Sequence, residues 1–172
     1  MNQCKRVFIV GHPGAGKELL GKTLAEKLNW RFIDADLGLE YYVGRSLNEI
    51  VGKEGEKKFL DCQSEILSAQ MNKERVVITT DASVVDSEKN TQILFSEFVV
   101  FLNASPSVQL ERVSKSFLPL LPGLELKDFF EKLHTQRDHL YQQVANVTIN
   151  TDNGKLEEHA EHVLKKISEK EA

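Results

Sequence analysis

The chain has 172 residues and a formal net charge of −4 at pH 7, with 41% hydrophobic and 28% charged residues. This length fits one domain with a substantial core over residues 1–172, and the interspersed charges, which form no basic stripe, argue against a nucleic-acid-binding protein. The sequence shows neither an apolar run long enough to span a membrane nor a charged-then-apolar leader, so we expect a cytoplasmic protein that does not act at a membrane.

A strand, a glycine-rich loop and a helix are predicted within residues 7–24. The apolar run 7–10 predicts the strand, and leucines at helical spacing from Leu19 onward predict the helix. The loop between them, GHPGAGKE, fits the phosphate-binding pattern G-x-x-x-x-G-K-[ST] except at its last position. In such a loop, main-chain N–H groups surround phosphate oxygens at a helix N-terminus, which favours an anion. We therefore expect nucleotide-binding residues, rather than an ordinary glycine-rich turn, at Gly11, Gly14, Ala15, Gly16, Lys17 and Glu18.

The last two positions of this loop carry opposite charges. Lys17 is placed to reach the β and γ phosphates of a nucleotide. Glu18 stands where the pattern has a Ser or Thr whose hydroxyl holds Mg²⁺. Its carboxylate is a hard oxygen ligand that could bind the metal itself, or its charge could weaken the binding of ATP. Both interpretations of Glu18 stay open in the sequence.

Two carboxylates follow the next predicted strand, at 31–33. Asp34 and Asp36 are two residues apart, so their side chains leave an extended backbone on the same side. The ends of strands are where α/β folds bind their ligands. The pair could therefore divide metal binding and proton acceptance, although Asp36 could also serve only as the N-cap of a helix.

The next segment predicts two helices and a strand. Ser46 and Glu49 match a capping box that opens a short helix ending at Gly52, and a longer helix runs over 54–69. The strand predicted at 76–80 ends in Asp81. An apolar strand that ends in aspartate resembles a Walker B element, whose carboxylate holds Mg²⁺, but Asp81 could also cap a turn or helix.

The rest of the chain continues the alternation of helices and strands. Helices are predicted at 87–95, 106–112, 127–144 and 156–167, and strands at 98–102 and 147–150. This alternation predicts an α/β fold whose parallel sheet has helices on both faces. Residues 114–126 have no clear helical period, and in a phosphoryl-transfer enzyme they would form a lid that excludes water.

The cysteines and histidines give no sign of a metal centre. Cys4 and Cys62 lie far apart and lack metal-ligand spacing, so we expect reduced thiols. His159 and His162 are one helical turn apart, but no third ligand is evident beside them. An exposed helix face is the better interpretation of that pair.

The order of these motifs resembles the shikimate kinase family over nearly the whole chain. Besides the phosphate-binding loop and the F-x-D-x-D segment, the shared motifs are Gly44-Arg45-Ser46, Gly55-Glu56 with Phe59, Pro119-Leu120-Leu121, and Arg137 with Leu140-Tyr141. The resemblance implies a three-layer P-loop kinase fold with a five-stranded parallel sheet in the order 2-3-1-4-5. It also implies transfer of the ATP γ-phosphate to the 3-hydroxyl of shikimate, with Mg²⁺ as cofactor. We expect a monomer whose partners are a nucleotide and a small hydroxylated acceptor.

The resemblance also implies a role for several single residues. Lys17 would stabilise the transferring phosphoryl group. Asp34 would assist Mg²⁺ through water, and Asp36 would contact the acceptor hydroxyl as the base. Arg112 would lie near the adenine, and Arg137 would clamp the acceptor carboxylate. These roles suit a reaction that depends mostly on positioning and charge neutralisation.

The chain departs from the family at the acceptor site and the lid. The departures are Glu18 for Ser or Thr, Leu60 for an arginine, Gln63 for a glutamate, Asp81-Ala82-Ser83 for three glycines, and Leu118 for the lid arginine. A transition-state arginine can supply roughly 10³–10⁵ in rate. Asp81 would repel an acceptor carboxylate, or could join Glu18 and Asp34 as a metal ligand.

Three functions therefore stay open. The first is a shikimate-kinase-like small-molecule kinase with poor activity on shikimate itself. The second is a non-catalytic protein that keeps the fold and binds a nucleotide or a protein partner. The third is a kinase for another small hydroxylated acceptor that lacks a carboxylate.

Overall fold

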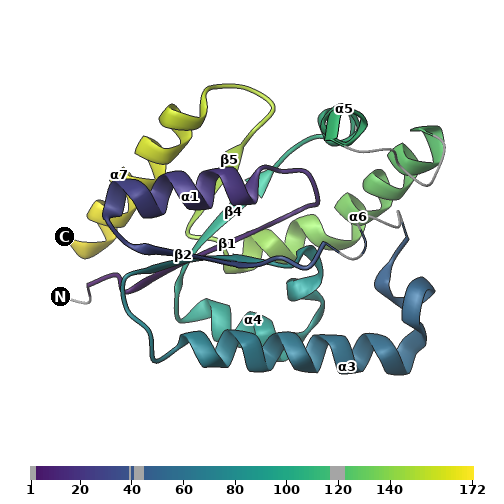
Figure 1. Cartoon of the computed structure of the whole chain (residues 1–172), viewed down its shortest axis with the longest axis horizontal. Coiled ribbons are helices and arrows are strands. Elements are labelled where there is room, and N and C mark those ends of the chain that lie inside the picture. Colours follow the sequence, from purple (N-terminus) through teal and green to yellow (C-terminus); the bar gives the residue numbers. More distant parts are fainter. Residues whose placement is uncertain (1–2, 39, 41–44, 117–122) are drawn as a thin grey trace.

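The computed structural model describes residues 3–38, 40, 45–116 and 123–172, and for 113–116 and 123–125 it describes only the backbone. Within this part of the chain, five strands form one parallel sheet in the order β2-β3-β1-β4-β5 (Figure 1). The strands are β1 (Arg6–Gly11), β2 (Arg31–Ala35), β3 (Val76–Thr80), β4 (Phe98–Asn103) and β5 (Val147–Asn150). The predicted strand order and the parallel sheet are confirmed.

Helices cover both faces of the sheet, as the sequence predicts. On one face lie α1 (Lys17–Leu28) and α7 (Leu156–Glu171), and on the other lie α3 (Leu47–Gln70), α4 (Glu88–Phe95) and α6 (Gly123–Val144) (Figure 1). The 3₁₀ helix η1 (Ala82–Asp86) follows β3, and α5 (Pro106–Ser116) follows β4 and contacts α6. Among the described helices, none combines the length and apolarity needed to cross a bilayer.

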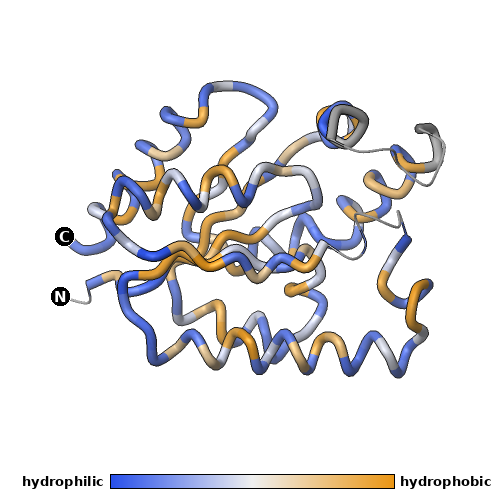
Figure 2. Tube along the Cα trace, in the orientation of Figure 1, coloured by the Kyte–Doolittle hydropathy of each residue, from blue (hydrophilic) through white to orange (hydrophobic). Residues whose placement is uncertain are grey.

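Strand β1 shows how the sequence produces these layers. Val7 and Ile9 belong to the core beneath α1 and α7, whereas Phe8 and Val10 belong to the core beneath α3, α4 and α6. Successive side chains of a strand point to opposite faces, so a strand buried on both sides needs an uninterrupted apolar run. Figure 2 shows the apolar strands gathered between the helical layers.

The two helices predicted over 46–69 are continuous except for one kink. Gly52 has φ 73° and ψ 174°, a conformation outside the helical region and easily reached only by glycine. The predicted capping interaction is present, because the Glu49 carboxylate accepts a hydrogen bond from the Ser46 main-chain N–H at 3.2 Å. The sequence placed the interruption correctly, and the structure shows that the helix resumes directly after it.

The segment 114–126, for which no helix is predicted, is helical at both ends. Helix α5 continues to Ser116, and α6 begins at Gly123 rather than at 127. Leu126 is buried with Phe130 and Leu133 in one cluster, which puts it on the same helical stripe. Residues 117–122, including Leu118, lie outside the described residues, so the rest of the expected lid stays a prediction.

Tyr141 on α6 joins the sheet to the start of η1. Its ring is fully buried and stacks on Phe101 of β4 with 4.9 Å between centroids. Its hydroxyl donates a hydrogen bond to the main-chain oxygen of Ala82 at 2.6 Å. Burial raises the pKa of this phenol and so favours the protonated hydroxyl that this hydrogen bond requires.

We expect Tyr141→Phe to lower the free energy of unfolding by about 1–3 kcal/mol, because the Ala82 carbonyl would remain buried without its partner. Urea denaturation at neutral pH measures the change. Thr135→Ala is the matched control, since it removes a hydroxyl from an exposed site on the same helix and should change stability by less than about 0.5 kcal/mol. An equal effect of the two substitutions would contradict the role given to the buried hydrogen bond.

Candidate active site

The glycine-rich loop between β1 and α1 has the form that a phosphate-binding loop requires. A Cβ atom at Gly11 would lie 2.3 Å from the main-chain oxygen of Leu102 on β4, so only glycine allows the two strands to approach this closely. Gly16 has φ 94°, which any other residue adopts only with strain. Both glycines are therefore needed to bring the loop to the N-terminus of α1.

Lys17 folds back into this loop. Its side chain is 4% exposed, and Nζ donates hydrogen bonds to the main-chain oxygens of Gly11 at 2.7 Å and His12 at 3.2 Å. The same Nζ lies 3.3 Å from Oδ2 of Asp36. The structure thus brings together the predicted phosphate-binding lysine and the predicted acceptor-binding aspartate.

Asp34 and Asp36 lie at the carboxyl end of β2. Oδ1 of Asp34 accepts hydrogen bonds from Thr79 Oγ1 at 2.6 Å and from the main-chain N–H of Asp36 at 3.0 Å. Burial raises the pKa of Asp36, and the charge of Asp81 raises it further, whereas Lys17 acts in the opposite direction. A carboxylate with a raised pKa is better suited to accept a proton than an ordinary one.

Asp81 is buried at the carboxyl end of β3. Its Oδ1 accepts hydrogen bonds from the main-chain N–H of Ser83 at 3.1 Å and from Ser83 Oγ at 2.7 Å, so it caps η1. Its Oδ2 is buried and has no hydrogen-bond partner within the described part of the chain. One oxygen therefore fills the capping role, and the other is left free for a cation.

A cavity of about 620 Å³ lies over these residues. Its described lining includes the loop 13–18 and the strand-end carboxylates. The charged lining residues are five acids, Glu18, Asp34, Asp36, Glu40 and Asp81, and two bases, Lys17 and Arg112. Because acids outnumber bases, a polyphosphate would bind with an accompanying cation more easily than alone. Asp34 and Asp81 are the residues that could hold such a metal, and oxygen ligands of this kind suit Mg²⁺.

Glu18 lies apart from the other carboxylates. Its side chain is 58% exposed and forms an ion pair with Lys22 at 2.5 Å along the outer face of α1. Although the residue borders the cavity, the structure does not bring its carboxylate together with Asp34 and Asp81 in one metal site. The idea that Glu18 replaces the missing hydroxyl as a metal ligand stays a prediction.

Arg112 connects three segments at the cavity wall. Its Nη1 donates to the main-chain oxygen of Gly14 at 2.8 Å and to Thr151 Oγ1 at 3.1 Å. Nη2 donates to the main-chain oxygen of Thr151 at 2.7 Å. Thr151 Oγ1 in turn donates to the main-chain oxygen of Ala15 at 2.9 Å. The arginine thus supports the phosphate-binding loop and borders the cavity, next to where the resemblance places the adenine.

Arg137 is engaged by two carboxylates of the chain itself. Its Nη1 and Nη2 donate to Glu40 at 2.8 and 3.0 Å. Nε and Nη2 donate to Asp86 at 3.1 and 2.7 Å. These four hydrogen bonds occupy four of the five N–H groups of the guanidinium, which is 3% exposed. Its predicted role as a clamp for an acceptor carboxylate would require at least one of these pairs to open.

Three of the departures from the family motifs contact one another. Gln63 Nε2 donates to Ser83 Oγ at 3.0 Å, and Ser83 Oγ donates to Asp81 Oδ1.

The sequence does not predict that Glu40 and Asp86 pair with Arg137, because no motif or spacing connects them with a residue on α6. Leu60, where the family pattern has an arginine, is half-buried on α3.

Comparison with known proteins gives a consistent result. The profile of the family described as shikimate kinase matches residues 13–168. A shikimate kinase from Mannheimia succiniciproducens is 31% identical over 170 residues, which cover 97% of each chain. The solved structure of shikimate kinase from Acinetobacter baumannii in complex with shikimate superposes with a TM-score of 0.78 and 30% identity, covering 97% of this chain and 94% of that one.

A bifunctional relative has a longer chain. The shikimate kinase/3-dehydroquinate synthase of Thermotoga maritima is 34% identical over 166 residues, and the match covers 96% of this chain but 33% of the relative. The similarity to this chain is therefore confined to about a third of the bifunctional protein.

We expect Lys17→Ala to weaken the binding of ATP about 10- to 100-fold, because a charge-assisted contact of about 1.5–3 kcal/mol is lost. Isothermal titration with ATP and Mg²⁺ measures the change. Lys22→Ala is the matched control, since it removes an exposed lysine from the next turn of the same helix. Similar losses of ATP affinity in the two variants would show that the overall positive charge of the protein, and not the specific contact of the Lys17 ammonium, binds the nucleotide.

The raised pKa of Asp36 gives a prediction about stability. An acid whose native pKa is raised binds its proton more tightly in the folded state, so ionisation costs stability as the pH rises. The wild type should therefore lose stability between a pH of about 3.9, where Asp36 ionises in the unfolded chain, and the higher pKa of Asp36 in the native protein. Asp36→Asn cannot ionise, so its free energy of unfolding relative to the wild type should increase over this range. Urea denaturation across this range tests the trend, and a gain that shrinks with rising pH would contradict it.

Proposed function

Because the chain belongs to the shikimate kinase family, we propose that it is an ATP- and Mg²⁺-dependent kinase that phosphorylates a hydroxyl of a small acceptor. The observation that carries this proposal is the position of Asp36, whose carboxylate lies 3.3 Å from the Lys17 ammonium beside the phosphate-binding loop. A phosphate-neutralising cation and a proton acceptor then face the same space. Phosphoryl transfer needs these two groups to be held in position.

The residues of the loop bind and orient the nucleotide in this proposal. Main-chain N–H groups of residues 14–18 surround the phosphates, and Lys17 leaves its loop carbonyls to neutralise the transferring group. Asp36 accepts a hydrogen bond from the acceptor hydroxyl and takes its proton as the oxygen–phosphorus bond forms and the bond between the γ-phosphorus and the bridging oxygen of ADP breaks. Arg112 keeps the loop in place through Gly14 and Thr151.

Asp34 and Asp81 would hold Mg²⁺. The unpartnered Oδ2 of Asp81 supports this assignment, because a buried carboxylate oxygen without a partner is costly unless a cation or donor reaches it. When bound, the metal neutralises charge on the phosphates. The excess of acids in the cavity makes this neutralisation necessary for a polyphosphate to enter.

We further propose that the favoured acceptor lacks a carboxylate. The Acinetobacter relative binds shikimate, so shikimate is the first acceptor to test. Here, however, Arg137 is already paired with Glu40 and Asp86, and Asp81 adds a negative charge to the cavity. An acceptor carboxylate would meet repulsion from Asp81, and Arg137 could offset it only by leaving Glu40 or Asp86.

We expect Leu60→Arg to raise kcat/KM for shikimate about 10- to 100-fold, because the family pattern has an arginine at this position, and its charge-assisted contact with an acceptor carboxylate would be regained. A coupled assay of ADP release with shikimate and with a panel of neutral polyols measures this. Asp61→Arg, which places the same side chain at the exposed neighbouring position, should leave kcat/KM near its original value.

This assay, together with the titration with ATP and Mg²⁺, separates the competing functions. High wild-type turnover of shikimate, with no gain from Leu60→Arg, would contradict the proposed acceptor class. ATP binding without turnover of any acceptor would favour the non-catalytic nucleotide-binding alternative. Failure to bind ATP at all would overturn the kinase proposal.

A further inference from the structure

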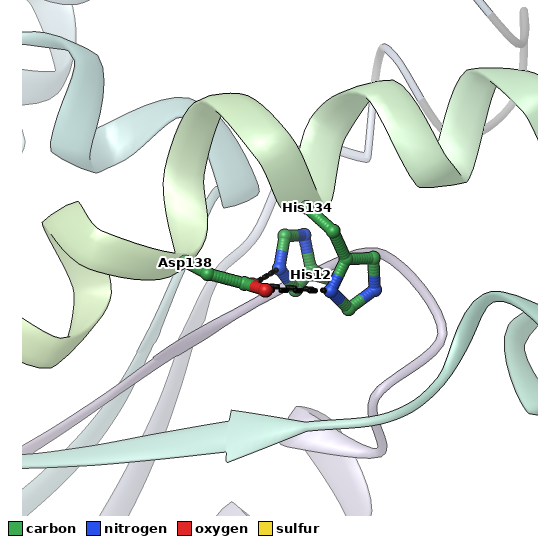
Figure 3. Close-up of side chains that lie close together, drawn as sticks. All are labelled: His12, His134 and Asp138. Atoms are coloured by element: carbon green, nitrogen blue, oxygen red, sulfur yellow. Dashed lines mark hydrogen bonds and ion pairs between the residues drawn. The ribbon is translucent and has the colours of Figure 1, made fainter.

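Two histidines and an aspartate form a cluster between the phosphate-binding loop and α6 (Figure 3). His12 belongs to the loop itself, and His134 and Asp138 lie one turn apart on α6. The Asp138 carboxylate lies 2.5 Å from His12 Nε2 and 3.1 Å from His134 Nδ1. The two imidazole rings are stacked with 3.7 Å between centroids and 28° between their planes, so one ring has to turn before the lone pairs of both can point at one ion. One potential ligand atom from each residue lies within 4.8 Å of the other two.

The proton positions in this cluster follow from a fourth residue, Gln109 on α5. A main-chain oxygen only accepts, so the Gln109 atom that lies 2.7 Å from the oxygen of Pro13 must be the amide nitrogen. The Gln109 oxygen therefore faces His134 Nε2 at 2.8 Å, and Nε2 must carry the proton that it donates. In a neutral imidazole, Nδ1 of His134 then has a lone pair and no hydrogen.

That lone pair faces the Asp138 carboxylate. Two acceptors at 3.1 Å repel each other unless a proton or a metal cation lies between them. A metal is well suited to the position, because histidines that bind metals usually donate their other N–H to an oxygen, as His134 does to Gln109. The Asp138 side chain is 36% exposed, which gives an ion and a water ligand access from solvent.

We propose that His12, His134 and Asp138 bind one transition-metal ion of the Zn²⁺ class, which fixes the phosphate-binding loop to α6. Two imidazole nitrogens and one carboxylate are a typical ligand set for Zn²⁺, with water as a fourth ligand. Mg²⁺ prefers oxygen ligands, so this ion is separate from the one proposed beside Asp34 and Asp81.

The ion would act on the loop through its main chain. His12 is fully buried, and its main-chain oxygen accepts a hydrogen bond from the Lys17 ammonium. The His12 ring is held at Nε2, which lies 2.5 Å from the Asp138 carboxylate, while its Nδ1 has no partner within the residues described. A metal bound at Nε2 would replace this hydrogen bond with a stronger coordinate bond between the loop and a helix that lies about 120 residues further along the chain.

Zinc titration of the full chain, freed of any affinity tag and of metal by chelation, tests the proposal. We expect about one equivalent of Zn²⁺ per chain by metal analysis. At a hundredfold excess over its dissociation constant, the ion should raise the melting temperature by about 5–10 °C. Co²⁺ bound at the same site should give the visible absorption of a tetrahedral complex.

Variants distinguish metal binding at this cluster from metal binding at exposed histidines. His134→Ala should lose both the thermal shift and the Co²⁺ spectrum, and Asp138→Asn provides a second loss if His134→Ala fails to fold. The control is His139→Ala combined with His162→Ala, which removes two exposed histidines and should keep both signals. Absence of zinc binding in the wild type, or equal binding in the control and in His134→Ala or Asp138→Asn, would overturn the proposal. Absence of zinc binding would mean that a proton, and not a metal, lies between Asp138 and His134.

Discussion

The cavity at the carboxyl ends of the strands contains more negative than positive charge, and the chemistry of the site depends on how this imbalance is met. Burial and the charge of Asp81 raise the cost of ionising Asp36, and the Lys17 ammonium offsets only part of that cost. Burial makes such charges interact more strongly than they would in water. Every negative ligand that enters must therefore bring a cation or displace a carboxylate from Lys17. In the proposed kinase, the binding of nucleotide and the binding of metal would be coupled for this reason.

The same constraint applies to the acceptor. Gln63, Ser83 and Asp81 replace family residues, and they form one hydrogen-bonded chain rather than three independent changes. Arg137 keeps its place on α6, but Glu40 and Asp86 neutralise it. A buried guanidinium paired with two carboxylates is expensive to separate, because each partner would be left desolvated and unpaired. Specificity in this cavity would then come from excluding anions as much as from attracting an acceptor.

Much of the fold could be predicted from local patterns. The uninterrupted apolar runs predict buried parallel strands, and the glycine spacing predicts the loop at the end of β1. The position of Gly52 predicts the interruption of α3, because its conformation depends on one residue. The start of α6 was predicted too late, since Leu126 continues the apolar stripe before residue 127.

The contacts between distant residues could not be predicted in this way. Glu40 and Arg137 are separated by 97 residues, and only the folded sheet and helices bring them together. His12 occupies a variable position of the loop pattern, so the motif gives no reason to connect it with His134. Each of these contacts joins a residue that follows a strand to α6, and the path of α6 across the molecule depends on the packing of the whole sheet. Local sequence patterns contain no information about such a path.

The carbonyl groups that surround Lys17 have a consequence for the kinetics of ligand capture. The main-chain oxygens of Gly11 and His12 hold the ammonium within the loop, so contacts inside the loop set its shape. A preorganised loop loses little conformational entropy on binding. Capture of a phosphate would then require only the exchange of oxygen partners around a single nitrogen atom, which is a faster motion than the ordering of a loop.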